Sequence, residues 1–360
     1  MEAPRTATLE FVRDLVDALI DLMLNYRQSG HPGGSRSKVP LLVSLTLSGH
    51  MRWDALRPWR TWADRFLLCA GHAAPAGYAL LAVLHEALRL HHLRSGSARP
   101  LFVHGPDHVL LPSDLLGFRR RGGLPGHAEM ADKTLFFKWN TGPSGHGLGA
   151  LVGQAMALKY AGAADTLVWG VEGEGGLTPG MAHEARNTAW GLGLSNARLL
   201  VDWNDFGIDA RPCSSVVHGT PADWFSPAGW RVEGTLAGED FPAILEVLAR
   251  LDERNDPRPA MGWFRTRKGR GYGKYDAASH GTPHPMNSPA FWDTKRDFQE
   301  RYSVRFEGFG QPAPMDPEGI RAQFAANVDT VIGVLRASPE RCDAIAERLL
   351  AIAATVPDRP

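Results

Sequence analysis

The sequence predicts an α/β protein built on a mostly parallel β-sheet with helices on both faces. Short, continuously apolar segments of the kind found in buried strands alternate with longer segments of helical periodicity. The strand-like segments lack the apolar–polar alternation of a sheet that exposes one face to water. The 360 residues, 44% of them hydrophobic, suit one large domain or two modest ones.

Helices are expected where apolar side chains recur on one helical face. The segment 8–27 carries such side chains from Leu9 to Met23. A second apolar segment, 39–48, follows a Gly-rich loop, and the small residues of 147–162 suit a closely packed helix. Further helices are expected at 75–93, 178–192, about 240–253, about 289–301, 317–336 and 339–354.

The strands are expected in four apolar runs that these helices separate. The runs are RFLLCAGHA (65–73), which turns into a glycine–histidine loop, TLVWGVEG (166–173), ARLLVDW (197–203) and PAMGWFRT (259–266). Residues 95–147 are rich in Gly, Pro and His and should be mostly loop, as should the basic, Gly-rich segment that begins near residue 267.

Composition argues against several classes of protein. The 39 basic and 39 acidic side chains give no net charge, so we expect neither a nucleic-acid nor an acidic-membrane partner. No apolar run is long enough to span a bilayer, and MEAPRTATLE lacks the apolar core of a signal peptide. Cys69, Cys213 and Cys342 are far apart and show no zinc or disulfide spacing. These features favour a cytoplasmic protein.

The most informative motif is GVEGEGGLTPG (170–180), which places Glu174 between two glycines at the end of an expected strand. Asn204 ends the next strand, thirty residues on. Adjacent parallel strands end at one edge of the sheet, where ligands bind. A carboxylate, an amide oxygen and a backbone carbonyl can hold Mg²⁺ or Ca²⁺, and glycines allow a diphosphate to approach the backbone. The alternative is a solvated strand-to-helix turn.

Other segments extend the pattern, in this order along the chain: SGHPGG (29–34), DRFLLCAGHA (64–73), GGLPGHAE (122–129), NTGPSGHGLGALVGQAMA (140–157) and HGTP (280–283). Together with GEG and Asn204, they resemble the N-terminal, diphosphate-binding half of the transketolase family over roughly residues 8–285. The resemblance implies the thiamine diphosphate-binding fold. It also makes RTRKGRGYGK (265–274) a loop before HGTP rather than a nucleic-acid patch.

The resemblance also implies roles for particular residues. Glu174, Asn204 and the carbonyl of Phe206 would bind the metal, Mg²⁺ or Ca²⁺. The expected cofactor-binding residues are His72, Gly142, Ser144, Glu174, Gly175, Asn204 and His280. The expected catalytic histidines are His31, His127, His280 and His72, of which His31 and His127 would contact the hydroxyls of a ketose. An imidazole can stabilise an alkoxide and accept a hydroxyl proton.

Three positions depart from the family pattern. Glu174 replaces an aspartate and lengthens the ligand by one methylene, His146 replaces a glutamine, and Pro179 replaces a glutamate near the cofactor. Residues 95–125 also diverge, so the identity of the sugar stays open.

The pyrimidine-binding domain that follows in this family does not fit into the residues after HGTP, whose pattern is helical. We therefore expect a diphosphate-binding α/β domain at 1–285 and a C-terminal helical extension packed on it at 286–360. A separate subunit would bring the pyrimidine-binding domain, in an α2β2 assembly, with the 147–162 helix and exposed Trp203, Trp224 and Trp230 as interface material.

Three functions are compatible with the sequence. The first is a transketolase-like subunit that transfers a two-carbon ketol unit between sugars or sugar-like substrates. The second is a subunit of a related thiamine enzyme that acts on a 2-oxo acid, an E1 component or a synthase. The third is a binding subunit without catalysis. His31 and His127 favour the first function, because a ketose needs several hydroxyl contacts.

Overall fold

The computed structural model describes residues 3–96 and 108–359 and forms a five-stranded parallel sheet in the order β1-β2-β3-β5-β4. Residues 97–107, part of the divergent segment 95–125, lie outside the described residues. The strands are β1 (Arg65–Leu68), β2 (Val168–Gly173), β3 (Ala197–Trp203), β4 (Arg231–Thr235) and β5 (Ala260–Arg265). The helices are α1 (Thr6–Arg27), α2 (Pro32–Ser48), α3 (Ala74–Ser95), α4 (His146–Tyr160), α5 (Gly180–Gly191), α6 (Pro221–Phe225), α7 (Phe241–Leu251), α8 (Pro289–Tyr302), α9 (Pro317–Arg336) and α10 (Pro339–Ala354).

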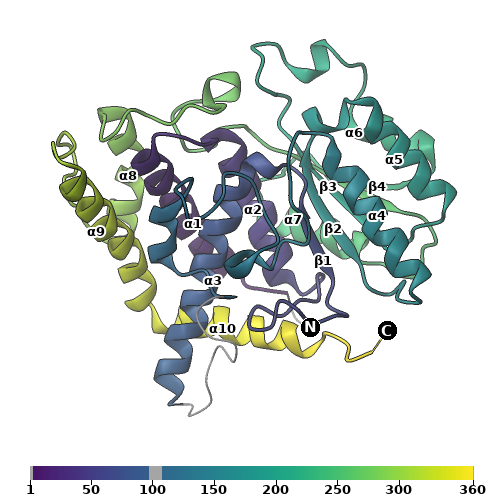
Figure 1. Cartoon of the computed structure of the whole chain (residues 1–360), viewed down its shortest axis with the longest axis horizontal. Helices are drawn as coiled ribbons and strands as arrows, with labels where there is room; N and C mark the ends of the chain where they lie inside the picture. Colours follow the sequence, from purple (N-terminus) through teal and green to yellow (C-terminus); the bar gives the residue numbers. More distant parts are fainter. Residues whose placement is uncertain (1–2, 97–107, 360) are drawn as a thin grey trace.

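Helices cover both faces of the sheet, as the sequence predicted (Figure 1). On one face, α4 and α5 pack over β1–β3 around a core that includes Leu151 and Leu199. On the other face, α2 and α7 lie against the sheet, and α1 and α3 form a further layer behind them. The strands are thus buried on both sides, which explains their continuous apolar character.

Helix α2 is buried along its whole length, although it contains Arg36 and Lys38. It begins at Pro32, whose fixed φ suits the first helical position. Its two charged side chains are buried as ion pairs, Arg36 with Asp21 at 2.8 Å and Lys38 with Asp202 at 2.8 Å. Pairing offsets the cost of removing these charges from water.

The three C-terminal helices follow the predicted pattern closely and pack on the outer helical layer. Helix α10 lies against α3, and α8 and α9 lie against α1 (Figure 1). Their apolar residues, such as Phe291 and Ile345, belong to the same core as Leu15 of α1. The Lys295 ammonium of α8 also forms a buried ion pair with Asp21 of α1, at 2.5 Å.

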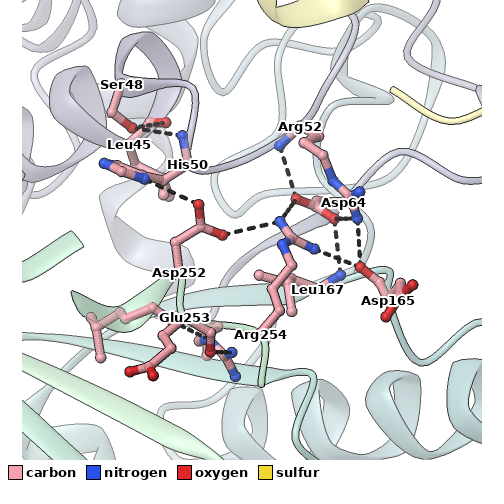
Figure 2. Close-up of polar contacts among 12 residues, drawn as sticks. Leu45, Ser48, His50, Arg52, Asp64, Asp165, Leu167, Asp252, Glu253 and Arg254 are labelled. Atoms are coloured by element: carbon pink, nitrogen blue, oxygen red, sulfur yellow. Dashed lines mark hydrogen bonds and ion pairs between the residues drawn. The ribbon is translucent and has the colours of Figure 1, made fainter. Parts of the chain in front are cut away.

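A polar network ties the elements together at the amino ends of β1 and β2 (Figure 2). The buried Asp64 carboxylate accepts hydrogen bonds from the Arg52 backbone N–H at 2.8 Å and the Leu167 N–H at 2.9 Å. It also pairs with the guanidinium groups of Arg52 and Arg254. This edge lies opposite the carboxyl ends of the strands, so its charges serve stability.

The structure contains one strand that was not predicted, and it contradicts one expectation. The edge strand β4 was not predicted, because Arg231–Thr235 contains one strongly apolar residue, Val232. Trp230 is not exposed interface material, since it is 2% exposed and donates its indole N–H to the Arg186 carbonyl. Trp203 and Trp224 are only partly exposed.

Candidate functional site

A pocket of about 390 Å³ opens where the carboxyl ends of β2 and β3 meet. The register explains why they meet, because Gly173 at the end of β2 pairs with Asp202 on β3. The sequence-predicted residues that line the pocket are His72, Ser144, Glu174, Gly175, Asn204, Phe206 and His280.

Glu174 and Asn204 come together at the base of this pocket. Both are buried, and the Asn204 backbone N–H donates to Glu174 Oε2 at 3.3 Å. Burial and, next, the Asp202 carboxylate raise the pKa of Glu174 to about 7. Glu174 Oε1 is buried without a hydrogen-bond partner among the described residues. A buried carboxylate oxygen left in this state is suited to a cation that enters the pocket.

The Asn204 side chain is already engaged. Its Nδ2 donates to Asp202 Oδ2 at 3.0 Å, and its Oδ1 accepts the Phe206 N–H at 3.1 Å. An amide oxygen has a second lone pair, so Asn204 Oδ1 can accept one further interaction. The Phe206 carbonyl oxygen in turn accepts from Lys268 Nζ at 3.0 Å.

Several side chains beside the pocket donate hydrogen bonds to the buried Asp202 carboxylate. Its Oδ2 accepts from Lys38 Nζ at 2.8 Å and from Ser37 Oγ at 2.6 Å, and its Oδ1 accepts from Thr266 Oγ1. Burial acts to raise the pKa of Asp202, but Lys38 and the hydrogen bonds outweigh it and leave the pKa lowered. Asp202 is therefore ionised and holds the Lys38 ammonium at the pocket wall.

A second carboxylate, Glu172, also lines the pocket. Its Oε1 accepts the Gly173 N–H at 2.9 Å, whereas Oε2 is buried without a partner among the described residues. Burial raises its pKa to about 7. Gly176 leaves room for it, because a Cβ there would lie 2.4 Å from the Glu172 carboxyl carbon.

Three of the four predicted catalytic histidines form one cluster. The ring centroids of His31 lie 5.2 Å from those of His72 and 5.0 Å from those of His280. Burial, followed by nearby cationic groups, lowers the pKa of His31 and of His280 to about 4 and lowers that of His72 as well. These imidazoles are therefore neutral at pH 7.

Close backbone approach makes this cluster possible. A Cβ at Gly33 would lie 2.0 Å from Ser279 Oγ, and one at Gly34 would lie 3.0 Å from His72 Nε2. The two glycines of SGHPGG therefore let the start of α2 pack against the loops that carry His72 and His280.

The structure places His31, His127 and Gly142 outside the pocket lining, although the His31 ring lies against His72 and His280, which do line it. His127 is exposed, and its ring lies beside Gly71, where a Cβ would come within 3.2 Å of His127 Cδ2. Gly142 is exposed, and a Cβ there would meet no atom within 4 Å. Both precede α4 in the chain, and Ser144, between Gly142 and α4, is the residue of this segment that lines the pocket.

Sequence reasoning missed Lys38, Glu172 and Lys268, which all line the pocket. Lys38 and Glu172 lie in apolar segments, and a charged residue in such a segment was the available signal. Lys268 lies in the basic run 265–274, whose other charges are used within the chain. Arg265 stacks on Trp203 at 4.9 Å and Arg270 pairs with Asp17 at 2.7 Å.

The chain matches a known protein family over the segment that forms this site. The sequence profile of the family described as "Transketolase, thiamine diphosphate binding domain" matches residues 110–305, more than half of the chain. The chain belongs to this family. The match includes β2, β3, β4 and β5 and most of the pocket lining, and it runs past residue 285 to include all of α8.

Individual transketolases are similar over much of the chain. "Transketolase 2" of Xanthobacter flavus is 29% identical over 92% of this chain and 51% of its own length. The plasmid-encoded transketolase of Cupriavidus necator is 30% identical over 71% of this chain and 36% of its own length. The chain thus spans about half, or less, of the curated transketolases it matches.

Solved structures show the same fold. The transketolase from Leishmania mexicana superposes with a TM-score of 0.66 at 24% identity, covering 96% of this chain and 48% of that one. The α/β fold expected for a member of this thiamine diphosphate-binding family is therefore confirmed. Within residues 3–96 and 108–359, no helix has the length and hydropathy to cross a membrane.

Proposed function

We propose that this chain is the diphosphate-binding subunit of a transketolase-like enzyme, which transfers a two-carbon ketol unit between sugars or sugar-like substrates. The observation that carries the proposal is Glu174, a buried carboxylate with one unpartnered oxygen, which contacts Asn204 at the joint ends of β2 and β3. This geometry occurs in a chain of the transketolase family.

Thiamine diphosphate is the proposed cofactor, with Mg²⁺ or Ca²⁺ at its diphosphate. Glu174 Oε1, Asn204 Oδ1 and the Phe206 carbonyl would hold the ion. The first of these oxygens is unpartnered, and the other two have a lone pair to spare. The described residues contain no cluster of three or more His, Cys, Asp or Glu that could hold a metal, so the diphosphate and water would complete the shell.

The glycine-bearing segments at Gly142, Ser144 and Gly175 would let the diphosphate approach the backbone. When bound, the cofactor supplies the carbon–carbon bond chemistry. The chain supplies proton transfer at the substrate. His31 is neutral and lies against His72 and His280, which line the pocket, and it is proposed to exchange a proton with a substrate hydroxyl. His72, His127 and His280 are proposed to position the remaining hydroxyl and phosphate oxygens.

We propose that the pyrimidine-binding half of the enzyme is a separate polypeptide. The chain covers 51% of one curated transketolase and 36% of another, so a pyrimidine-binding subunit in an α2β2 assembly would complete the site. In this view residues 1–285 are the diphosphate-binding unit, and 286–360 are an extension packed on it. A cytoplasmic location is proposed for the assembly.

The experiment is a ketol-transfer assay of the chain with and without a candidate pyrimidine-binding subunit, alongside gel filtration of the mixture. The proposal expects activity and a larger complex only when both chains are present. Transfer by this chain alone would exclude the split enzyme. A complex that binds thiamine diphosphate but shows no transfer would indicate a subunit without catalysis. The 2-oxo acid alternative is not favoured, because the similar proteins named above are transketolases.

A further inference from the structure

Glu172 is a buried acidic residue on the face of the sheet that α4 covers. Side chains alternate between the two faces along a strand, and Glu172 lies two residues beyond Gly170 in β2. A Cβ at Gly170 would lie 2.3 Å from Leu151 Cδ1 of α4. Glu172 itself is 1% exposed. An acidic side chain thus takes a strand position whose neighbour on the same face packs against an apolar helix.

The carboxyl group of Glu172 lies beside the segment that leads into α4. A Cβ at Gly176 would lie 2.7 Å from both of its oxygens, and one at Gly145 would lie 3.3 Å from the Gly176 carbonyl oxygen. Ser144, which precedes Gly145, lines the pocket together with Glu172 and Gly176. Glu172 therefore belongs to the part of the pocket wall that adjoins the start of α4.

The two oxygens of the Glu172 carboxyl group differ in their contacts. Oε1 accepts the Gly173 N–H at 2.9 Å, whereas Oε2 is buried without a hydrogen-bond partner within residues 3–96 and 108–359. The Lys38 ammonium, which lines the same pocket, pairs with Asp202 instead, at 2.8 Å. Burying an unpartnered carboxyl oxygen is costly, and a positive charge that enters the pocket would offset that cost.

The thiamine diphosphate assigned to this pocket carries charges of both signs. Its diphosphate is negative, and the proposed function places that group beside Glu174 and Asn204, with a divalent ion to neutralise it. Its thiazolium ring carries a positive charge that no proton loss removes. A carboxylate repels the first group and attracts the second. A second metal ion fits Glu172 less well, because the described residues hold no cluster of three or more His, Cys, Asp or Glu.

We propose that Glu172 is the counter-charge of the cofactor's thiazolium ring and makes the site select a cationic ring over a neutral ring of the same shape. The inference rests on the proposed function, because it assumes that the pocket receives thiamine diphosphate. It extends that function with a residue that determines cofactor specificity and is distinct from those assigned to the metal and the diphosphate.

The test is calorimetric titration of the purified chain, in excess Mg²⁺, with three ligands. They are thiamine diphosphate, the analogue in which an uncharged thiophene replaces the thiazolium ring, and inorganic pyrophosphate, which has no ring. The readout is the ratio of the dissociation constants for the first two. Glu172→Gln keeps an oxygen for the Gly173 N–H and removes the charge. It should shift this ratio by about tenfold or more in favour of the uncharged analogue, while its affinity for pyrophosphate stays within about threefold of the wild type.

Glu233→Gln is the matched control. It removes the charge of a β4 carboxylate that pairs with Arg250 at 2.7 Å and lies outside the pocket lining, so its ratio should equal that of the wild type. Gly176→Ala is a second variant, which keeps the Glu172 charge but places a methyl group against the carboxyl group. It should shift the ratio in the same direction as Glu172→Gln, and it decides the test if Glu172→Gln does not fold.

The outcomes separate the two claims. An unchanged ratio in Glu172→Gln would overturn the role of Glu172 and leave the cofactor site standing. An equal loss of affinity for all three ligands would also overturn it, because such a loss would indicate a general distortion of the pocket. Absence of wild-type binding to all three ligands would overturn the proposed cofactor site together with the inference.

Discussion

The imidazoles of His31, His72 and His280 contact one another beside two lysines, and this arrangement fixes their protonation. Lys268 Nζ donates to His280 Nδ1, so the ring proton of a neutral His280 must lie on Nε2. Burial and the surrounding cationic groups together disfavour a charged ring. At the residue scale, the site therefore presents neutral imidazoles, in which one ring nitrogen is a hydrogen-bond donor and the other an acceptor at physiological pH.

This protonation state gives a testable titration. With a pKa lowered from 6.5 to about 4, His31 should stay neutral as the pH falls through 6. Its ring resonance in an NMR titration of the ligand-free chain should have a midpoint near pH 4. Because the folded-state pKa lies below the unfolded one, the stability contributed by neutral His31 is lost as the pH falls from about 6.5 to 4. A midpoint near 6.5 would contradict the packing around His31.

At the scale of elements, helix α4 is held close to β1 by a glycine. A Cβ at Gly147 would lie 2.3 Å from Cys69 Cβ and 2.6 Å from Cys69 Cα, which is backbone. Because α4 begins beside the pocket, this contact also sets the position of Ser144 on the preceding loop. The small residues in 147–162 predicted a closely packed helix. They did not show that Gly147 makes the contact, because its partner, Cys69, lies far earlier in the chain, directly after β1.

A pair of substitutions in α4 tests this contact. Gly147→Ala should lower the free energy of unfolding by about 2 kcal/mol, because the new methyl group forces the helix away from the sheet. Gly153→Ala is the control, since a Cβ there meets no atom within 4 Å, and alanine should stabilise the helix by about 0.5 kcal/mol. Urea denaturation measures both, and equal effects would argue against the close packing of α4 on β1.

The network around Asp64 makes a second prediction at this scale (Figure 2). Asp64→Ala should destabilise the fold by about 3 kcal/mol, because it leaves the Leu167 N–H without its acceptor and two guanidinium groups without their shared carboxylate. Asp293→Ala removes an exposed ion pair on α8 and should cost less than about 1 kcal/mol. Thermal melts compare them, and a similar loss in both variants would show that the network carries little stability.

Local pattern therefore predicted some features and not others. The central strands and the C-terminal helices were expected where they occur, because each has a strong periodicity of its own. Strand β4 was missed because it forms by pairing with β5, and the local sequence RVEGT does not indicate that pairing. The Lys38–Asp202 pair was missed because its members are 164 residues apart, and nothing near Lys38 indicates that its partner lies at the pocket.

At the scale of the whole molecule, the C-terminal helices are part of the hydrophobic core. Phe291, Val331 and Ile345 are buried in the core that contains α1 and α3. The Lys295 ammonium of α8 forms an ion pair with the Asp21 carboxylate of α1, and both side chains are fully buried. Helices α8, α9 and α10 therefore share one hydrophobic core with α1 and α3.

Truncation after residue 285 tests this arrangement. Loss of α8–α10 would expose apolar residues of α1 and α3, each contributing roughly 1.5–3 kcal/mol when fully buried. We expect the full chain to unfold in one urea transition, and the truncated chain to aggregate or unfold at a clearly lower urea concentration. An unchanged midpoint would show that the extension contributes no stability to residues 1–285.

The central claim is that the pocket at the ends of β2 and β3 binds thiamine diphosphate through Glu174. Calorimetric titration with thiamine diphosphate and Mg²⁺ tests it most directly, using wild type, Glu174→Gln and the control Glu246→Gln, which alters an exposed ion pair on α7. Glu174→Gln should fold normally, since it removes a carboxyl group whose charge burial disfavours. We predict that it loses binding at least about tenfold while the control matches the wild type. Equal affinity in all three proteins would contradict the claim.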